Sequence, residues 1–264
     1  MNPALLSMAA LAGLCAAFAL VYLLARRIDN YGIVDVAWSY AFAALAAAYA
    51  LLGPGWPIRR ALIASMVTVW SLRLGTHLLV RIARKHPVED GRYAQLRRDW
   101  SGSLNAKMAG FFQFQALSVV VLGIPFLAAC SNASDSLSAV EWVGCALWAV
   151  AISGEALADA QLSSFKRQAG KAGGVCDGGL WRYSRHPNYF FEWLIWVSFF
   201  VFGLASPHGL LGVVSPACIL FLLLRVTGIP ATEEQSVRSK GAAYRSYQER
   251  TSPFVPLPPR KPKA

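Results

Sequence analysis

The stretch ALLSMAALAGLCAAFALVYLLA, residues 4–25, contains no charged side chain and is followed directly by Arg26 and Arg27. A helix needs about 20 apolar residues to cross the hydrocarbon core of a bilayer, so this stretch is long enough to span a membrane. Nothing basic precedes it, and it exceeds the ~7–15 apolar residues typical of a secretory signal. We therefore interpret it as a transmembrane helix.

Further apolar runs of this kind, each bounded by charge, proline or glycine, follow along the chain at 33–53, 61–82, 110–130, 140–162, 188–206 and 209–229. Charged or polar residues interrupt the runs 61–82 and 140–162. The sequence therefore predicts an all-α, polytopic membrane bundle of seven transmembrane helices, with six as the alternative. In this interpretation residues 1–264 form a single integral membrane domain without a separate soluble domain, and residues 256–264 form a disordered tail.

The composition agrees with a membrane protein. Hydrophobic residues make up 56% of the chain and charged residues 15%, against about 45–50% and about 25% in soluble globular domains. This balance excludes a disordered chain, a coiled coil and a collagen-like fibre. Five cysteines show no C-x-x-C motif or His/Cys cluster, so the sequence suggests neither a disulfide framework nor a metal site.

The distribution of Lys and Arg predicts the orientation. These residues resist translocation and accumulate on the cytoplasmic side. With seven spans and the N-terminus outside, the exterior segments hold only Arg59 and Arg60, and the C-terminus is cytoplasmic. The same distribution explains the net charge of +11 without a nucleic-acid partner. The polar segments 83–109, 164–187 and 230–264 all fall on the predicted cytoplasmic side, so we expect the active site there.

Ionisable side chains within the spans are candidates for function, because each costs at least ~2.5–3.5 kcal/mol to insert. Asp35 begins the second span, either as a carboxylate favoured by the helix dipole or as an acid that faces substrate. A basic face on the third span is formed by residues three or four positions apart, which share one side of a helix: Arg73, His77, Arg81 and Arg84. Either it binds an anionic ligand or its long side chains reach the interface.

Glu155 and Asp159 lie four residues apart on the fifth span, with Lys166 and Arg167 at its exit. Like charges on one helix face repel, so this pair needs partners. Internal salt bridges or ligand hydroxyls and amides would both serve.

The most informative motif is GGLWRYSRHPNY, residues 178–189, which leads into the sixth span with Glu192 one turn further on. Pro187 suits the first turn of a helix, and a helix N-terminus is an anion site. Trp181, Tyr183 and Tyr189 fit an interfacial aromatic belt. Interleaved with Arg185, His186 and Asn188, they also fit a bound nucleotide.

The motif RHPNY at 185–189, together with Glu233-Glu234, Tyr244, Tyr247 and Pro253-Phe254, resembles the superfamily of membrane steroid 5-alpha-reductases and sterol C14-reductases. Isoprenylcysteine carboxyl methyltransferases are more distant relatives. The stretches VDVAW at 34–38 and EDGRY at 89–93 further resemble a bacterial branch of the 5-alpha-reductase group. This resemblance covers nearly the whole chain and implies the bacterial inner membrane as location.

The resemblance implies that NADPH is the cofactor, that residues 164–254 form its binding portion, and that the charges already noted hold it. Its cofactor pattern falls on Asp159, Asn188, Glu192, Arg225 and Tyr244, with Arg73 on the third span. The full set of candidate cofactor-binding residues is Arg73, Arg81, Arg84, Glu155, Asp159, Lys166, Arg167, Trp181, Tyr183, Arg185, His186, Asn188, Tyr189, Glu192, Arg225, Glu234, Tyr244 and Tyr247. Asp35 and His77 are the candidate catalytic residues.

The sequence departs from the 5-alpha-reductase pattern in its substrate region. The Gln-Glu pair of the second span is missing, Asp35 is the nearest acid, and Trp70 occupies the position of the Tyr that polarises the substrate ketone. We therefore expect an NADPH-dependent reductase that transfers a hydride to an activated C=C bond of a steroid-like or other lipid. The alternative is an S-adenosylmethionine-dependent methyltransferase that acts on a lipid or a prenylcysteine-type acceptor. Neither the substrate nor the oligomeric state follows from the sequence.

Overall fold

The computed structural model describes residues 2–169, 174–226 and 228–260, and every regular element among them is a helix. The all-helical fold class is therefore confirmed. The chain packs as two compact units. Unit 1 comprises residues 1–141 and 202–212, and unit 2 comprises residues 142–201 and 213–264.

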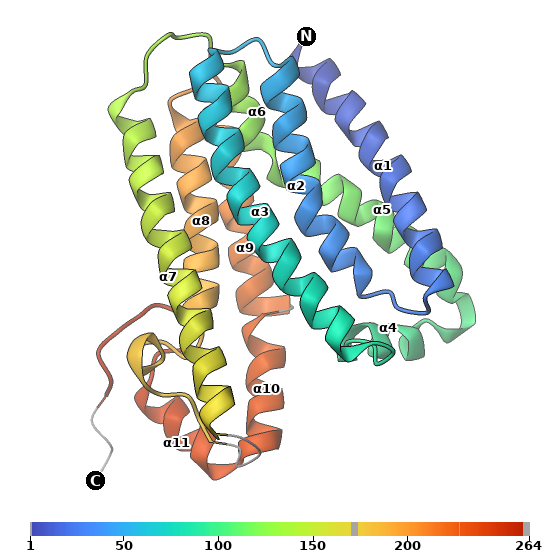
Figure 1. Ribbon diagram of the computed structural model, residues 1–264, viewed down its shortest axis with the longest axis vertical. Coiled ribbons are helices and arrows are strands. Elements are labelled where there is room, and N and C mark those ends of the chain that lie inside the picture. Colours follow the sequence, from blue (N-terminus) through green and yellow to red (C-terminus); the bar gives the residue numbers. More distant parts are fainter. Residues whose placement is uncertain (1, 170–173, 227, 261–264) are drawn as a thin grey trace. The chain divides into compact units, whose positions relative to one another are not determined.

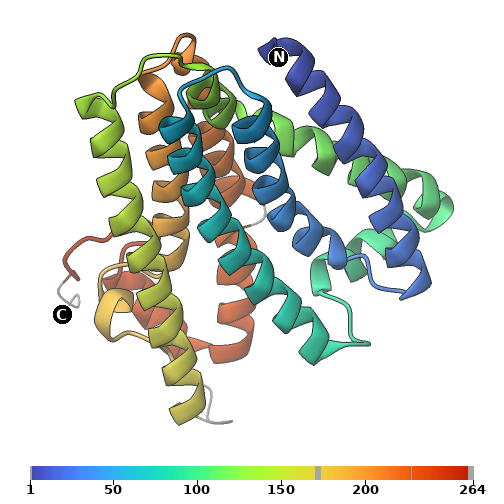
Figure 2. The same cartoon turned by 45° about the horizontal axis from the view of Figure 1, so that its top comes forward.

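Unit 1 is built from helices that are mostly long and apolar: α1 (Pro3–Arg27), α2 (Ile33–Leu52), α3 (Pro57–Lys85), α4 (Gly91–Asp99), α5 (Leu104–Leu122) and α6 (Ile124–Ser131). Proline opens α1 and α3, where its missing N–H costs no hydrogen bond. Helix α2 lies between α1 and α3 in both views, and α1 also packs against α5 (Figures 1 and 2).

Aromatic rings fill the core of unit 1. Phe42 is fully buried on α2 and contacts Trp70 on α3, with ring centroids 5.4 Å apart. It also contacts Trp38 at 4.7 Å and Phe126 of α6 at 6.4 Å. Trp70, which replaces a ketone-polarising Tyr in the sequence comparison, is thus a packing residue of this core.

Unit 2 holds most of α7 (Ala139–Ala169) and α8 (Pro187–Leu204), with the shorter helices α9 (Val214–Phe221), α10 (Ile229–Lys240) and α11 (Ala242–Arg250). Helices α7 and α8 lie side by side in both views (Figures 1 and 2). Gly154 makes this approach possible, because a Cβ there would overlap the ring of Phe191.

Six described helical runs are long and apolar enough to cross a membrane: Pro3–Arg27, Ile33–Leu52, Pro57–Lys85, Ser101–Ser131, Ala139–Gln168 and Gly209–Lys240, the last of which includes residue 227 outside the described residues. They cover all the predicted spans except 188–206, where α8 forms. A multi-pass membrane protein is therefore confirmed. The number of spans is six if α8 does not cross the membrane and seven if it does. The orientation of the termini stays a prediction.

Some boundaries differ from the predicted ones for local reasons. The span predicted at 110–130 is divided at Gly123 into α5 and α6, and Pro125 stands in the first turn of α6, where the ring cannot continue the preceding hydrogen bonds. Helix α7 continues to Ala169, so Lys166 and Arg167 lie in its last turn rather than in a loop.

The C-terminal segment is only partly described. Within residues 256–260 of the predicted tail, the Leu257 N–H donates to the Tyr183 carbonyl (2.9 Å) and the Arg260 N–H to the Arg250 carbonyl (2.8 Å). Residues 261–264 lie outside the described residues.

Candidate functional site

Asp35 lies in the first turn of α2 in unit 1 and accepts two side-chain hydrogen bonds from α4. Arg92 Nη2 lies 2.7 Å from Asp35 Oδ2, and the Tyr93 hydroxyl lies 2.6 Å from Asp35 Oδ1. Asp90 caps the start of α4 through the Arg92 N–H (3.1 Å) and also pairs with Arg92 Nε. We call Asp35, Asp90, Arg92 and Tyr93 the Asp35 cluster.

Burial and neighbouring charges shift the pKa values of Tyr93 and Asp90 in this cluster. Burial, and next the charge of Asp35, raise the pKa of Tyr93 well above its ordinary value, so the hydroxyl keeps its proton. Burial alone would raise the pKa of Asp90, but the Arg92 N–H and the charges of Arg92 and Arg81 hold it below its usual value. Tyr93 is therefore a neutral donor that points at a carboxylate.

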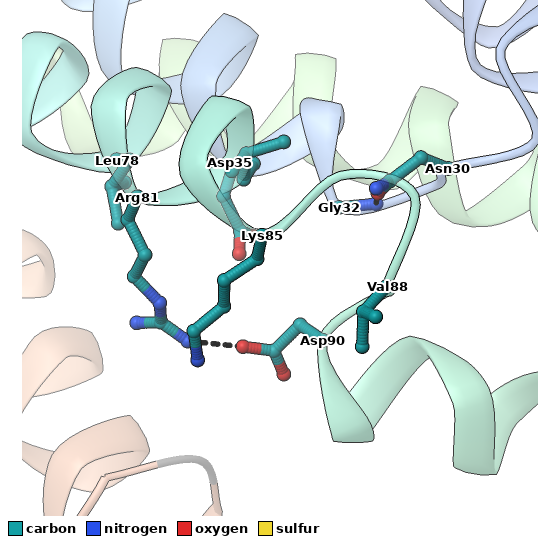
Figure 3. Close-up of a pocket in the computed structure, with 9 residues that line it drawn as sticks. Asn30, Gly32, Asp35, Leu78, Arg81, Lys85, Val88 and Asp90 are labelled. Atoms are coloured by element: carbon teal, nitrogen blue, oxygen red, sulfur yellow. Dashed lines mark hydrogen bonds and ion pairs between the residues drawn. The ribbon is translucent and has the colours of Figure 1, made fainter.

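A small pocket beside the Asp35 cluster is lined by the ends of α2 and α3 and by the loop before α4 (Figure 3). Asp35, Arg81, Lys85 and Asp90 all line it, and Arg81 pairs with Asp90. Two of the predicted residues, Asp35 and Arg81, are thus brought together. His77 is exposed on α3 and does not line this pocket.

The basic face predicted on the third span does form on one helix, because all four of its residues lie in α3. Arg73 is half-buried, whereas His77, Arg81 and Arg84 are exposed. The positive charge of Arg81 is balanced by Asp90, so this position is less available to an anion than the sequence suggests.

The motif at 184–186 in unit 2 is held by the C-terminal segment. Ser184 forms an isolated β-bridge with Ser252, and the Arg185 N–H donates to the Ser252 carbonyl (2.8 Å). The Ser184 hydroxyl donates to the Phe254 carbonyl (2.7 Å) and accepts from the His186 N–H (3.1 Å). The resemblance had linked these two parts of the chain, and the structure joins them by hydrogen bonds.

Glu233 on α10 is the centre of the polar contacts in unit 2. Arg185 donates to both of its carboxylate oxygens, from Nε to Oε1 at 2.8 Å and from Nη2 to Oε2 at 3.0 Å. His186 Nε2 lies 2.9 Å from Oε1, the Tyr244 hydroxyl donates to Oε1 at 3.0 Å, and Gln248 donates to Oε2. We call these five residues the Glu233 cluster.

The Glu233 cluster is largely closed to water. The side chains of Arg185 and Glu233 are 10% and 14% exposed. Burial and then the charge of Glu233 raise the pKa of Tyr244, so its hydroxyl stays protonated and donates. Because the guanidinium of Arg185 is already bound by a carboxylate in a bidentate pair, its role here is to fix the motif in place.

Asp159 and Asn188 are also brought together. Asn188 stands in the first turn of α8, and its Nδ2 lies 3.3 Å from Asp159 Oδ1 on α7. One turn further on, Glu192 Oε1 accepts from Trp196 Nε1 at 3.0 Å. Glu155, one turn before Asp159 on α7, is buried at 5% exposure. These side chains form a polar strip along α7 and α8 in unit 2.

The predicted aromatic residues have separate tasks. Trp181 is buried, and its Nε1 donates to the Ala158 carbonyl (3.0 Å). Tyr247 is also buried, and its hydroxyl donates to the Trp181 and Ser184 carbonyls. The Tyr189 ring stacks on His186 with centroids 5.4 Å apart. Tyr183 is 43% exposed, so it is more open to solvent than the other three.

The other predicted cofactor residues lie apart from these contacts. Lys166 and Arg167 are exposed at the end of α7, and Arg225 is exposed in a short π-helix at 222–226. Glu234 is 63% exposed and pairs with Arg238 one turn away. Glu234 thus faces away from the cluster that Glu233 forms.

Sequence reasoning missed five residues of these clusters. The sequence presents Glu233 only as half of a Glu-Glu pair and Asp90, Arg92 and Tyr93 only as part of a motif, and it gives no signal for Gln248. On a helix, neighbouring residues point about 100° apart, so only one member of the pair can face Arg185. Nothing in the sequence reveals which one, since that depends on the rotation of α10.

Comparison with known proteins gives two matches. Residues 21–251 match the model of the family described as Protein of unknown function (DUF1295). The uncharacterized protein C594.04c of Schizosaccharomyces pombe is 27% identical over 256 residues, which cover 86% of this chain and 73% of the yeast protein. No solved structure matches the chain.

Proposed function

Because the chain belongs to the DUF1295 family of membrane proteins, we propose that it is an integral membrane reductase that uses NADPH to transfer a hydride to an activated C=C bond of a steroid-like or other lipid substrate. The observation that carries this proposal is the hydrogen bond between Asn188 and Asp159. The resemblance assigns both positions to the cofactor, and the structure brings them within 3.3 Å although they are far apart in sequence.

The residues present fit a nicotinamide cofactor, with one group suited to its amide and ribose and another to its phosphates. The polar strip of Asp159, Asn188 and Glu192 offers both donors and acceptors to an amide and to ribose hydroxyls. Lys166 and Arg167, exposed on the last turn of α7, offer cations to phosphates. Bound NADPH would supply the hydride, while these groups would bind and orient it.

The Glu233 cluster positions the start of α8 rather than binding phosphate. Arg185 and His186 are held by Glu233 and by backbone carbonyls of Gln248 and Thr251. This fixes the residues directly before Asn188. A small shift of a positioned binding group can lower the rate by a large factor. The Glu233 cluster would therefore support activity by keeping Asn188 in place.

Hydride transfer to a C=C bond also needs a proton for the neighbouring carbon. In unit 1, the Asp35 cluster holds a proton on Tyr93, whose pKa is raised, next to the Asp35 carboxylate. Such a pair can hold and pass a proton through general acid catalysis. His77, the other predicted catalytic residue, is exposed on α3 and is not part of this cluster. Its catalytic role stays a prediction.

One observation keeps the methyltransferase alternative open. The Arg-His-Pro element and the Glu-Glu pair resemble both enzyme classes, and the charge of Arg185 is balanced by Glu233. Arg185 therefore needs no phosphate group to balance its charge. S-adenosylmethionine, which carries none, would fit the same polar strip.

Thermal unfolding of the detergent-purified chain tests the proposal, with NADPH, NADH or S-adenosylmethionine added separately. A ligand at about 100 times its Kd adds about 2.7 kcal/mol of stability. We expect NADPH to stabilise the wild type and the control Asn105→Ala, because Asn105 is exposed in unit 1. We expect Asn188→Ala to stay folded and lose the response. Stabilisation by S-adenosylmethionine alone would replace the reductase with a methyltransferase.

Asp35→Asn separates catalysis from cofactor binding. Asparagine keeps an acceptor for Tyr93 but cannot take up and pass on a proton, so proton transfer through the pair should weaken while the contacts of the cofactor residues in unit 2 are kept. We expect NADPH stabilisation to persist and reduction of an enone lipid to fall by about 10²-fold or more. Asp29→Asn is the matched control, because Asp29 is 84% exposed and its salt-bridge partner is Arg97, which lies outside the Asp35 cluster. Full activity of Asp35→Asn would show that Asp35 has no catalytic role and is only a carboxylate favoured by the helix dipole.

A further inference from the structure

A second cleft in unit 2 is lined by three arginines that the proposed reductase does not use. The cleft has a volume of about 430 Å³, and Arg182, Arg250 and Arg260 line it. That volume falls within the ~300–1,000 Å³ of small-molecule sites. We refer to it as the arginine cleft.

Three separate segments supply these arginines. Arg182 ends the short 3-10 helix Gly179–Arg182, Arg250 ends α11, and Arg260 belongs to the C-terminal segment. Backbone hydrogen bonds fasten that segment to both neighbours, through Leu257 to Tyr183 and through Arg260 to Arg250. The convergence is therefore built into the fold and does not depend on one helix face.

The charge of the arginine cleft is only partly balanced. Asp177 lines it and lies 3.5 Å from Arg250, which leaves two of three positive charges uncompensated. Within residues 2–169, 174–226 and 228–260, the guanidinium groups of Arg182 and Arg260 make no hydrogen bond or ion pair. A concave surface with one sign of charge concentrates counter-ions, so an anion is the natural occupant.

The cleft wall next to Arg182 leaves room for such an anion. Gly178 and Gly179 line it and present backbone instead of side chains. No heavy atom lies within 4 Å of the position that a Cβ at Gly178 would take, so this part of the wall is open. At Gly179 the φ of +58° and the amide of Gln161 exclude a larger residue. A glycine pair lets an oxyanion approach the backbone closely.

We propose that the arginine cleft is a binding site for a phosphate-bearing ligand. The guanidinium fork matches phosphate oxygens in a bidentate manner, and several arginines from separate segments can grip one phosphate group from different sides. This phosphate could belong to a soluble molecule or to the headgroup of an anionic lipid, since the chemistry is shared. The cleft adjoins the Glu233 cluster but shares none of its five side chains: Arg185 donates to the carbonyl of Thr251, and Thr251 also lines the cleft.

The test uses the full chain and a double variant, Arg182→Gln with Arg260→Gln. Inorganic pyrophosphate is titrated into protein in neutral detergent at constant ionic strength, with thermal stabilisation as the readout. In parallel, retention of phosphatidylglycerol over phosphatidylcholine is measured by native mass spectrometry. The matched control is Arg238→Gln with Arg245→Gln, which removes the same charge from exposed positions on α10 and α11.

We expect the double variant to weaken at least one of these affinities by about tenfold or more, because hydrogen bonds to charged groups are lost. The control should change both affinities by less than about twofold. A loss confined to pyrophosphate identifies a soluble ligand, and a loss confined to phosphatidylglycerol identifies a lipid headgroup. If the double variant and the control respond alike to both probes, or if the wild type binds neither, the proposal is wrong.

Folding of the double variant is checked without ligand. Removing like charges should leave its melting temperature unchanged or raise it, because the three arginines repel each other. If it does not fold, the variant Arg182→Lys with Arg260→Lys replaces it, which keeps the charge and loses the bidentate fork. Affinities equal to those of the wild type in this variant would overturn the arginine fork as the binding element.

Discussion

Glu233→Ala is expected to lower the free energy of unfolding by about 3–5 kcal/mol, the range found when one partner of a buried ion pair is removed. Arg185 would keep its positive charge at 10% side-chain exposure without the carboxylate that binds two of its nitrogens. The hydroxyl of Tyr244 and the ring of His186 would lose the same acceptor. Chemical or thermal unfolding in detergent measures the loss.

The neighbouring residue provides the control for this prediction. Glu234→Ala removes the same group one position along α10, but Glu234 is 63% exposed and its partner Arg238 is 77% exposed. Such a pair contributes about 0–1 kcal/mol. Equal destabilisation by the two variants would show that Glu233 has no special place in unit 2.

The functional consequence of Glu233→Ala is a second readout. The proposed cofactor residue Asn188 follows His186 by two positions, and the Glu233 cluster fixes that stretch. We therefore expect Glu233→Ala to lose NADPH stabilisation as well, whereas Glu234→Ala keeps it. Glu233→Gln, which preserves shape and one acceptor, should restore part of the stability. The gain over Glu233→Ala measures shape and hydrogen bonding, and the remaining loss relative to the wild type measures the effect of charge.

Glu141→Ala is expected to destabilise unit 1 by a similar amount, about 3–5 kcal/mol. Arg59 and Glu141 form an ion pair with side-chain exposures of 1% and 0%. Arg59 also donates to the carbonyls of Asn132, Ser134 and Ser136, so this pair organises the loop before α7. Loss of the carboxylate would leave a buried, unpaired guanidinium, and unfolding in detergent would report it.

Asp135→Ala is the matched control, because Asp135 is exposed in the same loop. A double-mutant cycle with Arg59→Met sharpens the test. Residues in one hydrogen-bonded pair show coupling energies of about 0.5–3 kcal/mol, so the double variant should lose less stability than the sum of the single variants. Strict additivity would contradict a direct interaction. The sequence places Arg59 among the exterior loop charges, whereas in the structure it is buried in the first turn of α3 and paired with Glu141.

The sequence by itself determined that the protein is an all-helical membrane protein and where most spans lie. Hydropathy is a local property, and a run such as 4–25 is apolar whatever surrounds it, so α1 follows from composition and length alone. Helices α1, α2, α7 and α8 begin within one residue of the predicted spans, whereas α3 and α5 begin earlier than predicted, at Pro57 and Leu104. The motif at 184–189 and the acidic pair at 233–234 could also be singled out, because unusual polar residues flank apolar runs.

Tertiary structure alone decided which polar groups meet. The partners of Arg185 and Arg59 lie 48 and 82 positions away, and no local pattern encodes such a distance. Which of Glu233 and Glu234 binds Arg185 depends on the rotation of α10, and Asp35 meets Arg92 only because α4 packs at the start of α2. Hydrogen bonds act over about 3 Å, so these contacts exist only after packing has fixed the position and rotation of each helix.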